Sequence, residues 1–202
     1  HKKVVLLGDP IMDVYVHCED MSVAAEGPLI SVAPIHEVSY AGGGALIAMQ
    51  LAAVGVDVTL ITTRPEGERG LAFQQQLERA NVNVVMLPCP QRPTYVKTRY
   101  LVENQKVFKI NQGGHAPLGS VEVREMLSLL EENLEGADFF MVVDFGYGLL
   151  GTQLIEDIQQ IITQRDIPFS IDVSRAGITN LLKFKGPALA TPTEDELRFA
   201  FG

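Results

Sequence analysis

The sequence predicts an α/β protein whose mostly parallel sheet is covered by helices on both faces, with a small β layer beside it. Short runs that are apolar throughout alternate with segments of helical periodicity. Strands without polar alternation are typical of a parallel sheet that is buried on both faces. Two other segments, residues 14–40 and 95–111, alternate apolar and polar residues, which suits a half-exposed sheet. We therefore expect a three-layer αβα core and a separate small β layer formed by these two segments.

The first half of the chain supplies buried strands and two helices of the expected core. Residues 3–7 form a continuous apolar run that ends in a Gly-Asp-Pro turn, which indicates a strand. The glycines at 42–44 open a helix that Gly55 closes. Three more elements follow in order: a strand over 56–62, an amphipathic helix over 67–80 with Leu71, Phe73 and Leu77 inward, and a strand over 82–88.

The second half begins with a hairpin and then returns to the α/β alternation. The hairpin pairs residues 94–102 with 106–110 around a turn at 103–105. Thr152 is expected to cap a helix in which apolar residues recur at helical spacing. The remaining expected elements are helices over 121–134 and from Glu194 onward, and strands over 138–146, 168–173 and 188–192.

Composition excludes several classes of protein. The 202 residues include 25 Asp plus Glu against 16 Lys plus Arg, a net charge of −9, which disfavours nucleic acid as a partner. The two cysteines, Cys18 and Cys89, suit neither a disulfide scaffold nor a metal site, so we expect a reducing, cytoplasmic setting. No apolar run is long enough to span a bilayer, so no membrane partner is expected. The chain starts without Met and ends inside an expected helix, so both ends look cut.

Several polar or glycine motifs fall beyond the carboxyl ends of expected strands, where α/β sheets bind ligands. They are Asp9 and Asp13 after the first strand, Gly42-Gly43-Gly44 at the first helix, Asp144 with Gly146 and Gly148, and Asp172 with Arg175. Each alone is explained as well by a turn or a helix cap. The glycine triplet could let backbone N–H groups approach a ligand, or could serve only tight packing of the helix on the sheet. The convergence of these motifs on one rim indicates a site.

Two cations, Lys97 and Arg99, are expected on one face of their strand, because side chains alternate with a period of two. In an acidic protein this pair suggests an anionic ligand such as a phosphorylated sugar. Basic residues that protect an exposed edge strand explain it equally well.

A dinucleotide fingerprint, a Walker motif and a G-x-S-x-G nucleophile motif are all absent, which makes an NAD-type oxidoreductase improbable.

The motifs together resemble the ribokinase/PfkB superfamily of sugar kinases, nearest to the heptose-phosphate kinase domain of ADP-heptose synthases. The resemblance runs through the whole chain in order: Gly8-Asp9-x-x-x-Asp13, AGGGALIAMQLAAVGVDVTLI, PTYVKTRYLVENQKVFKIN, DFGYGLL and GPALATPTEDEL. It implies a Rossmann-like, ribokinase-like αβα core (1–13, 41–94 and 112–202) and a β lid (14–40 and 95–111) over the sugar. It also implies transfer of a phosphoryl group from ATP to a sugar hydroxyl.

The resemblance also implies roles for individual residues. Asp13 would bind sugar hydroxyls, and Gly42 and Gly43 would offer backbone to the sugar. Asp144 is included among the substrate contacts. Lys97, Arg99, Asn104 and Gln105 on the lid would lie near the substrate and its phosphate. Thr193 and Glu196, in a TPNxxE-like motif, would organise the nucleotide phosphates and, through Glu196, Mg²⁺ indirectly.

The chain departs from the family pattern at several positions. Leu46 and Thr193 replace expected Asn residues, and Tyr147 replaces an expected Lys. The GAGD-type motif with the catalytic Asp base would lie beyond residue 202, so the chain alone is expected to be inactive. We therefore keep two hypotheses: the substrate-binding part of a carbohydrate kinase, or a catalytically impaired, kinase-derived protein that binds a sugar or nucleotide. Expected partners are a sugar or sugar phosphate, a second copy through the lid, and a fused nucleotidyltransferase domain.

Overall fold

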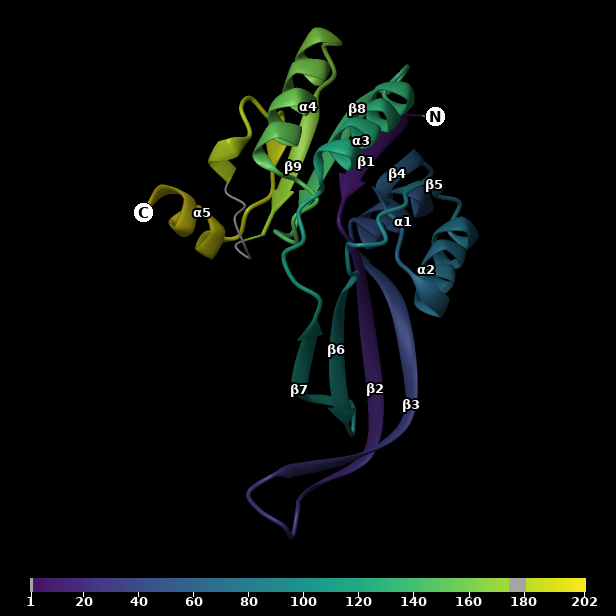
Figure 1. Cartoon of the computed structure of the whole chain (residues 1–202), viewed down its shortest axis with the longest axis vertical. Coiled ribbons are helices and arrows are strands. Elements are labelled where there is room, and N and C mark those ends of the chain that lie inside the picture. The colour runs from purple at the N-terminus through teal and green to yellow at the C-terminus, as the bar shows by residue number, and fades with distance from the viewer. Residues whose placement is uncertain (1, 175–180) are drawn as a thin grey trace.

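The computed structural model describes residues 2–174 and 181–202 and contains two sheets (Figure 1). The larger sheet has six parallel strands in the order β10-β9-β8-β1-β4-β5, as the apolar runs predict. Its strands are β1 (Lys3–Gly8), β4 (Asp57–Thr63), β5 (Asn83–Leu87), β8 (Phe139–Asp144), β9 (Phe169–Val173) and β10 (Leu189–Ala190). The expected α/β fold with a mostly parallel sheet is therefore confirmed.

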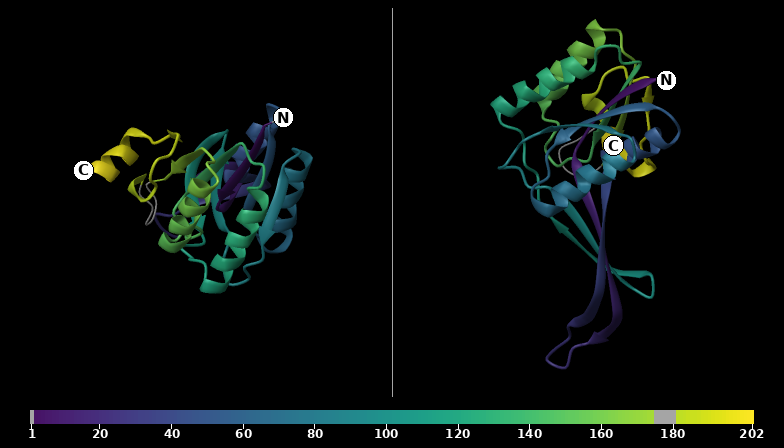
Figure 2. Two further views of the ribbon diagram at one scale, coloured as in Figure 1. Left: turned by 90° about the horizontal axis from the view of Figure 1, so that it is seen from above. Right: turned by 90° about the vertical axis from the view of Figure 1, so that its right-hand side faces the viewer.

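Helices cover both faces of this sheet (Figure 2). On β1, Leu6 points into one apolar cluster with residues of α1 and α2, whereas Val5 and Leu7 point into another with residues of α3 and α4. This alternation follows from the two-residue period of a strand. The helices are α1 (Gly44–Ala53), α2 (Gly67–Arg79), α3 (Ser120–Asn133), α4 (Thr152–Gln164) and α5 (Glu194–Phe201), with a 3₁₀ turn, η1, at Leu181–Lys183. No helix among the described residues is long and apolar enough to cross a membrane.

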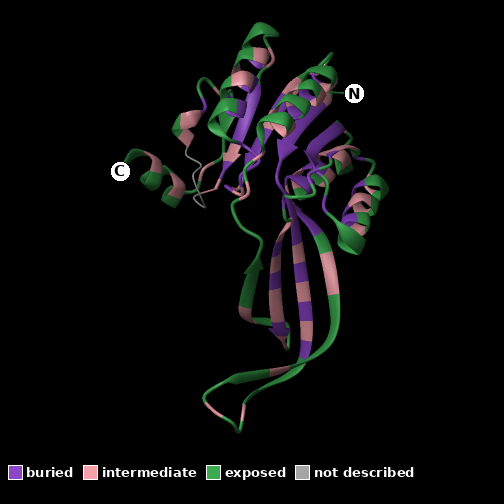
Figure 3. Cartoon of the chain, viewed as in Figure 1, coloured by how far each residue is buried: buried purple, intermediate pink, exposed green. Residues whose placement is uncertain are grey.

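The second sheet, called the small sheet below, has four strands in the order β3-β2-β6-β7. They are β2 (Pro10–Val23), β3 (Ile30–Gly43), β6 (Tyr95–Val102) and β7 (Gln105–Gln112). The small sheet projects beyond the carboxyl ends of the large sheet, and β2 and β3 extend past the β6–β7 hairpin (Figure 1). That hairpin turns at Glu103 and Asn104, which both have positive φ, as a two-residue turn of this kind requires. Burial alternates along β2, so one face is apolar and the other carries polar side chains (Figure 3).

Four sequence-based expectations are corrected by the structure. The small sheet begins at Pro10, because β2 follows β1 after Asp9 alone, and Asp13 therefore lies within a strand. Helix α1 begins at Gly44, so Gly42 and Gly43 end β3. Gly151, not Thr152, is the N-cap of α4. Leu71 is 64% exposed, because it lies about 200° around α2 from the buried Phe73.

Candidate functional site

Asp13 lies on the polar face of β2, between two neighbouring strands. Its register partners are Tyr40 on β3 and Lys97 on β6. Arg99 Nη1 donates a hydrogen bond to Asp13 Oδ1 at 2.5 Å, and both side chains are about one-fifth exposed, at 20% and 21%. A Cβ on Gly42 would overlap the Asp13 carboxylate, so the absence of a side chain at Gly42 makes room for Asp13. The sheet register thus brings together a carboxylate, two cations and a glycine that were predicted separately.

The Lys97 ammonium is surrounded by aromatic rings. Lys97 Nζ lies 5.3 Å from the ring centroid of Phe145, 5.7 Å from that of Tyr147 and 6.0 Å from that of Tyr95. Tyr95 and Tyr147 stack with ring centroids 3.6 Å apart. Burial lowers the pKa of Lys97, the nearby cations Arg99 and Lys109 lower it further, and the charge of Asp13 opposes this change. Aromatic rings and a carboxylate therefore compensate a half-buried positive charge.

The three glycines where β3 meets α1 have different structural roles. Gly43 has a φ of +60°, and a Cβ there would approach Ile11 Cδ1 to 2.8 Å and Phe145 Cε2 to 3.2 Å. At Gly44 a Cβ would lie 3.1 Å from Leu6 Cδ2, which is tight packing of the helix on the sheet. Gly42 faces Asp13. The packing interpretation is therefore confirmed for Gly44, whereas Gly42 makes room for the Asp13 carboxylate. The approach of a ligand to this backbone stays a prediction.

A cleft of about 440 Å³ lies over the polar face of the small sheet, against α1. Leu46, at the position where the resemblance expects Asn, lines this cleft and is 47% exposed. The other lining residues are Asp13, Tyr15, His17, Tyr40, Ala41, Met49 and Leu101. The cleft therefore combines one carboxylate with aromatic and apolar side chains, a lining typical of a site for a small polar molecule with apolar C–H faces.

Asp144 ends β8 and is buried, with 1% of its surface exposed. Its Oδ1 accepts a hydrogen bond from the Gly146 backbone N–H at 2.9 Å, and its Oδ2 has no partner among the described residues. Burial raises the pKa of Asp144 to about 7, and the nearby Asp9 contributes to this increase. The side chain therefore changes its charge near neutral pH.

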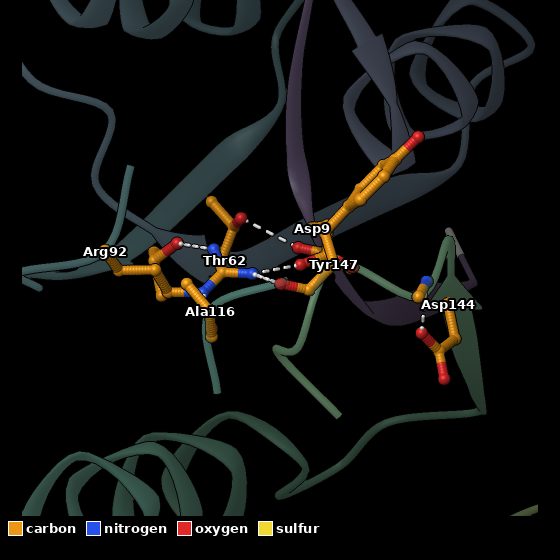
Figure 4. A network of polar contacts seen from close by, with 9 residues as sticks. Asp9, Thr62, Arg92, Ala116, Asp144 and Tyr147 are labelled. Atoms are coloured by element: carbon orange, nitrogen blue, oxygen red, sulfur yellow. Dashed lines mark hydrogen bonds and ion pairs between the residues drawn. The ribbon is translucent and has the colours of Figure 1, made fainter. Parts of the chain in front are cut away.

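Arg92, which sequence reasoning missed, forms the most extensive polar network near the site (Figure 4). It forms a buried ion pair with Asp9, in the connection from β1 to β2. It also donates hydrogen bonds to Thr63 Oγ1 at 2.8 Å and to the carbonyl oxygens of Ala116 at 3.0 Å and Tyr147 at 3.2 Å. The signal in the sequence was Asp9, which directly follows a buried strand and therefore needs a cationic or hydrogen-bonding partner.

Four of the predicted site residues lie away from Asp13. Asn104 and Gln105 are exposed at the hairpin turn, and Gln105 pairs with Val102, five residues beyond Lys97, about 17 Å along β6. Thr193 and Glu196 form a capping box at the start of α5, in which Thr193 N–H donates to Glu196 Oε2 at 2.7 Å. This helix follows edge strand β10, three strands from β1. Arg175 lies outside the described residues.

The fold is one that carbohydrate kinases share. Phosphofructokinase-2 from Escherichia coli, solved with substrates and products, matches with a TM-score of 0.74 and 19% identity. The match covers 98% of this chain and 62% of that one. A ribokinase from Giardia lamblia matches with a TM-score of 0.62 and 14% identity, over 88% of this chain and 56% of that one.

The sequence comparison defines the family. The pattern of the pfkB family of carbohydrate kinases matches residues 1–202, and the chain belongs to that family. Bifunctional protein HldE of Trichlorobacter lovleyi is 26% identical over 201 residues, and that of Haemophilus influenzae strain PittEE is 26% identical over 200. Each match covers 99% of this chain but only 40% of the length of the relative.

Proposed function

We propose that this protein transfers a phosphoryl group from ATP to a hydroxyl of a sugar phosphate, with a heptose phosphate as the first candidate. The observation that carries the proposal is the Asp13 carboxylate beside Arg99 and Lys97 on one face of the small sheet, next to a cleft. A carboxylate accepts hydrogen bonds from sugar hydroxyls, and cations bind a phosphate. Membership of a carbohydrate kinase family supports the same reaction class.

In this proposal Asp13 accepts hydrogen bonds from the sugar, while Gly42 and Gly43 let the sugar approach the backbone. Arg99 moves from Asp13 toward the phosphate when the hydroxyl takes its place. Asp144, at the carboxyl end of β8, remains a predicted substrate contact. Asn104 and Gln105 also remain predictions of the resemblance, which their place at the hairpin turn does not support.

The nucleotide is proposed to bind at the ends of β9 and β10. Burial raises the pKa of Asp172, and the nearby charge of Glu196 raises it further. Carboxylate oxygens are ligands that Mg²⁺ prefers. No cluster of three His, Cys, Asp or Glu suited to a metal occurs among the described residues, so Glu196 and Asp172 fit only an indirect role, near Mg²⁺ and not as a complete ligand set. ATP would supply the phosphoryl group, and Mg²⁺, when bound, would neutralise charge on its phosphates.

The proposal extends to the longer protein. The chain spans 40% of the length of the HldE relatives, which are named bifunctional proteins, so we propose a nucleotidyltransferase domain fused to this one in a cytoplasmic enzyme. We propose that the catalytic base follows residue 202, so the assay uses the full-length protein. It should release ADP from ATP and Mg²⁺ with at least one heptose or hexose phosphate. No ADP release with any of them would favour the alternative, a kinase-derived binding protein.

Replacing Lys97 and Arg99 together with alanine should weaken sugar-phosphate binding at least tenfold. Each charge-assisted hydrogen bond to a phosphate contributes about 1.5–3 kcal/mol. Calorimetric titration measures the affinity, and thermal unfolding shows whether the variant folds. Lys106→Ala with Arg124→Ala is the matched control, since it removes one Lys and one Arg from exposed positions. Equal affinity of the Lys97/Arg99 variant and this control would refute the anion contact.

We also propose that two copies pair through the small sheet. Four large apolar side chains on the outer parts of β2 and β3 are exposed: Met21, Val23, Ile30 and Ile35. An exposed β layer with apolar side chains pairs readily across a two-fold axis. Sedimentation should show a dimer, and Ile30→Glu with Ile35→Glu should shift it toward the monomer. A wild-type monomer at micromolar concentration would contradict this proposal.

A further inference from the structure

The small sheet joins the large sheet through four chain connections. They are Asp9 between β1 and β2, the direct junction of β3 with α1 at Gly43 and Gly44, residues 88–94 between β5 and β6, and residues 113–119 between β7 and α3. The orientation of the small sheet depends on what holds these connections together. Gln76 on α2 secures β3 directly, since it donates to Ser39 O at 3.0 Å and accepts from Ala41 N–H at 2.9 Å. The other three connections converge on Arg92.

Arg92 lies in one of these connections and contacts the other two. Its guanidinium pairs with Asp9 and donates through Nε to Ala116 O, while two more donors reach Thr63 at the end of β4 and Tyr147 after β8. Only 8% of Arg92 and 1% of Asp9 are exposed. Because guanidinium N–H donors point in fixed directions, these acceptors define the relative positions of five chain segments.

The same contacts lead directly to the site. Asp9 precedes β2, which carries Asp13 four residues later. Tyr147, whose carbonyl accepts from Arg92, stacks its ring on Tyr95 of β6 and lies beside the Lys97 ammonium. A change at Arg92 therefore reaches the carboxylate through one strand and the ammonium through one aromatic ring.

We propose that Arg92 is a positioning residue that fixes the small sheet over the carboxyl ends of the large sheet and so places Asp13 and Lys97 for the sugar phosphate. This inference rests on the proposed function for its ligand, but not for its mechanical part. Burial raises the pKa of Asp9 and the charge of Arg92 opposes this, in agreement with a pair that is stable only when both partners are present.

The test removes both charges at once, because a single truncation would leave a buried charge unpaired. The variant is Asp9→Asn with Arg92→Met, which keeps side-chain volume. Hydrogen exchange should become at least tenfold faster in β2 and β6, while β1 and β8 stay within threefold of wild type. The sugar-phosphate Kd should rise at least tenfold. Lys2→Met with Asp138→Asn removes an ion pair at the other end of the large sheet and should change neither quantity.

Arg92→Lys provides a second arm if the double variant does not fold. Lysine keeps a positive charge for Asp9 but cannot donate the hydrogen bonds that Arg92 makes to Ala116, Thr63 and Tyr147. The exchange rates in β2 and β6 should therefore lie between those of wild type and those of the double variant. Unchanged exchange in β2 and β6 in the folded variants would overturn the proposal. If wild type binds no sugar phosphate, the proposed function fails, while faster exchange confined to the small sheet still supports the positioning role. The two proposals therefore fail separately.

Discussion

Replacing Gly148 with alanine should lower the free energy of unfolding by about 3 kcal/mol or more, which combines backbone strain with overpacking. Gly148 has a φ of +98°, and a Cβ there would lie 2.6 Å from the carbonyl carbon of Ala116 and 2.8 Å from Pro117 N. These are backbone atoms, so no side-chain rotation relieves the overlap. Moving Ala116 away would also break its N–H hydrogen bond to Tyr147 O and the bond that its carbonyl accepts from Arg92, each 3.0 Å long.

Gly186→Ala separates the two causes. Gly186 also has a positive φ, +70°, but its Cβ would have no described atom within 4 Å. The loss there should be about 1–2 kcal/mol, the cost of the left-handed conformation alone. Urea unfolding of both variants measures the difference. Equal losses would show that the segment around Ala116 yields without cost and that its contact with Gly148 adds nothing.

The large sheet was predictable because its residues are constrained locally. The runs at β1 and β8 are almost entirely apolar, and in the structure both of their faces meet helices. On β4, Leu60 and Ile61 likewise point into different clusters. The helices follow the same logic, as Phe73 and Leu77 on α2 show. The prediction that Leu71 points inward was wrong because it rested on the apolar type of the residue. The position of Leu71 around the helix axis places it on the exposed face. Local periodicity therefore predicts the core well.

The border between the two sheets was harder to predict, because β1 of the large sheet continues into β2 of the small sheet with only Asp9 between them. Asp9 and Pro10 resemble a turn that ends a strand, yet β2 starts at Pro10, where its register partner is Gly43. Proline is compatible with the first residue of a strand, so its presence did not exclude this continuation. Asp13 consequently lies within the small sheet, opposite Lys97.

The candidate site was predicted as a set of residues but not as a set of contacts. The pairing of Asp13 with Arg99 joins positions 86 residues apart, and that of Asp9 with Arg92 joins positions 83 residues apart. Such pairs depend on sheet register, which no local pattern reports. The common face of Lys97 and Arg99 followed from strand periodicity and is confirmed by their shared neighbour Asp13. The aromatic surroundings of Lys97 required Phe145 and Tyr147 from a distant loop.

Wild-type stability should fall as pH rises from about 4 to 8, and Asp144 should be a main cause. Its pKa in the folded protein, about 7, exceeds the ordinary 3.8, so the folded state binds the additional proton between these values. The stabilisation is complete below about pH 4 and is lost as pH rises through 7. The shift corresponds to at most about 4 kcal/mol at 1.36 kcal/mol per pKa unit. The raised pKa values of Asp9 and Asp172 act in the same direction.

Asp144→Asn should therefore gain stability relative to wild type as pH increases, by a few kcal/mol between pH 4.5 and pH 8. The Asn side-chain oxygen can still accept the Gly146 N–H, and the amide carries no charge to desolvate.

Asp138→Asn is the control with the opposite sign, because hydrogen bonds from Lys2 and Lys3 lower the pKa of Asp138. That variant should lose stability relative to wild type above about pH 4, and the loss should disappear in acid. Unfolding free energies across this pH range measure both effects. A difference between Asp144→Asn and wild type that does not vary with pH would mean that Asp144 titrates at its ordinary value.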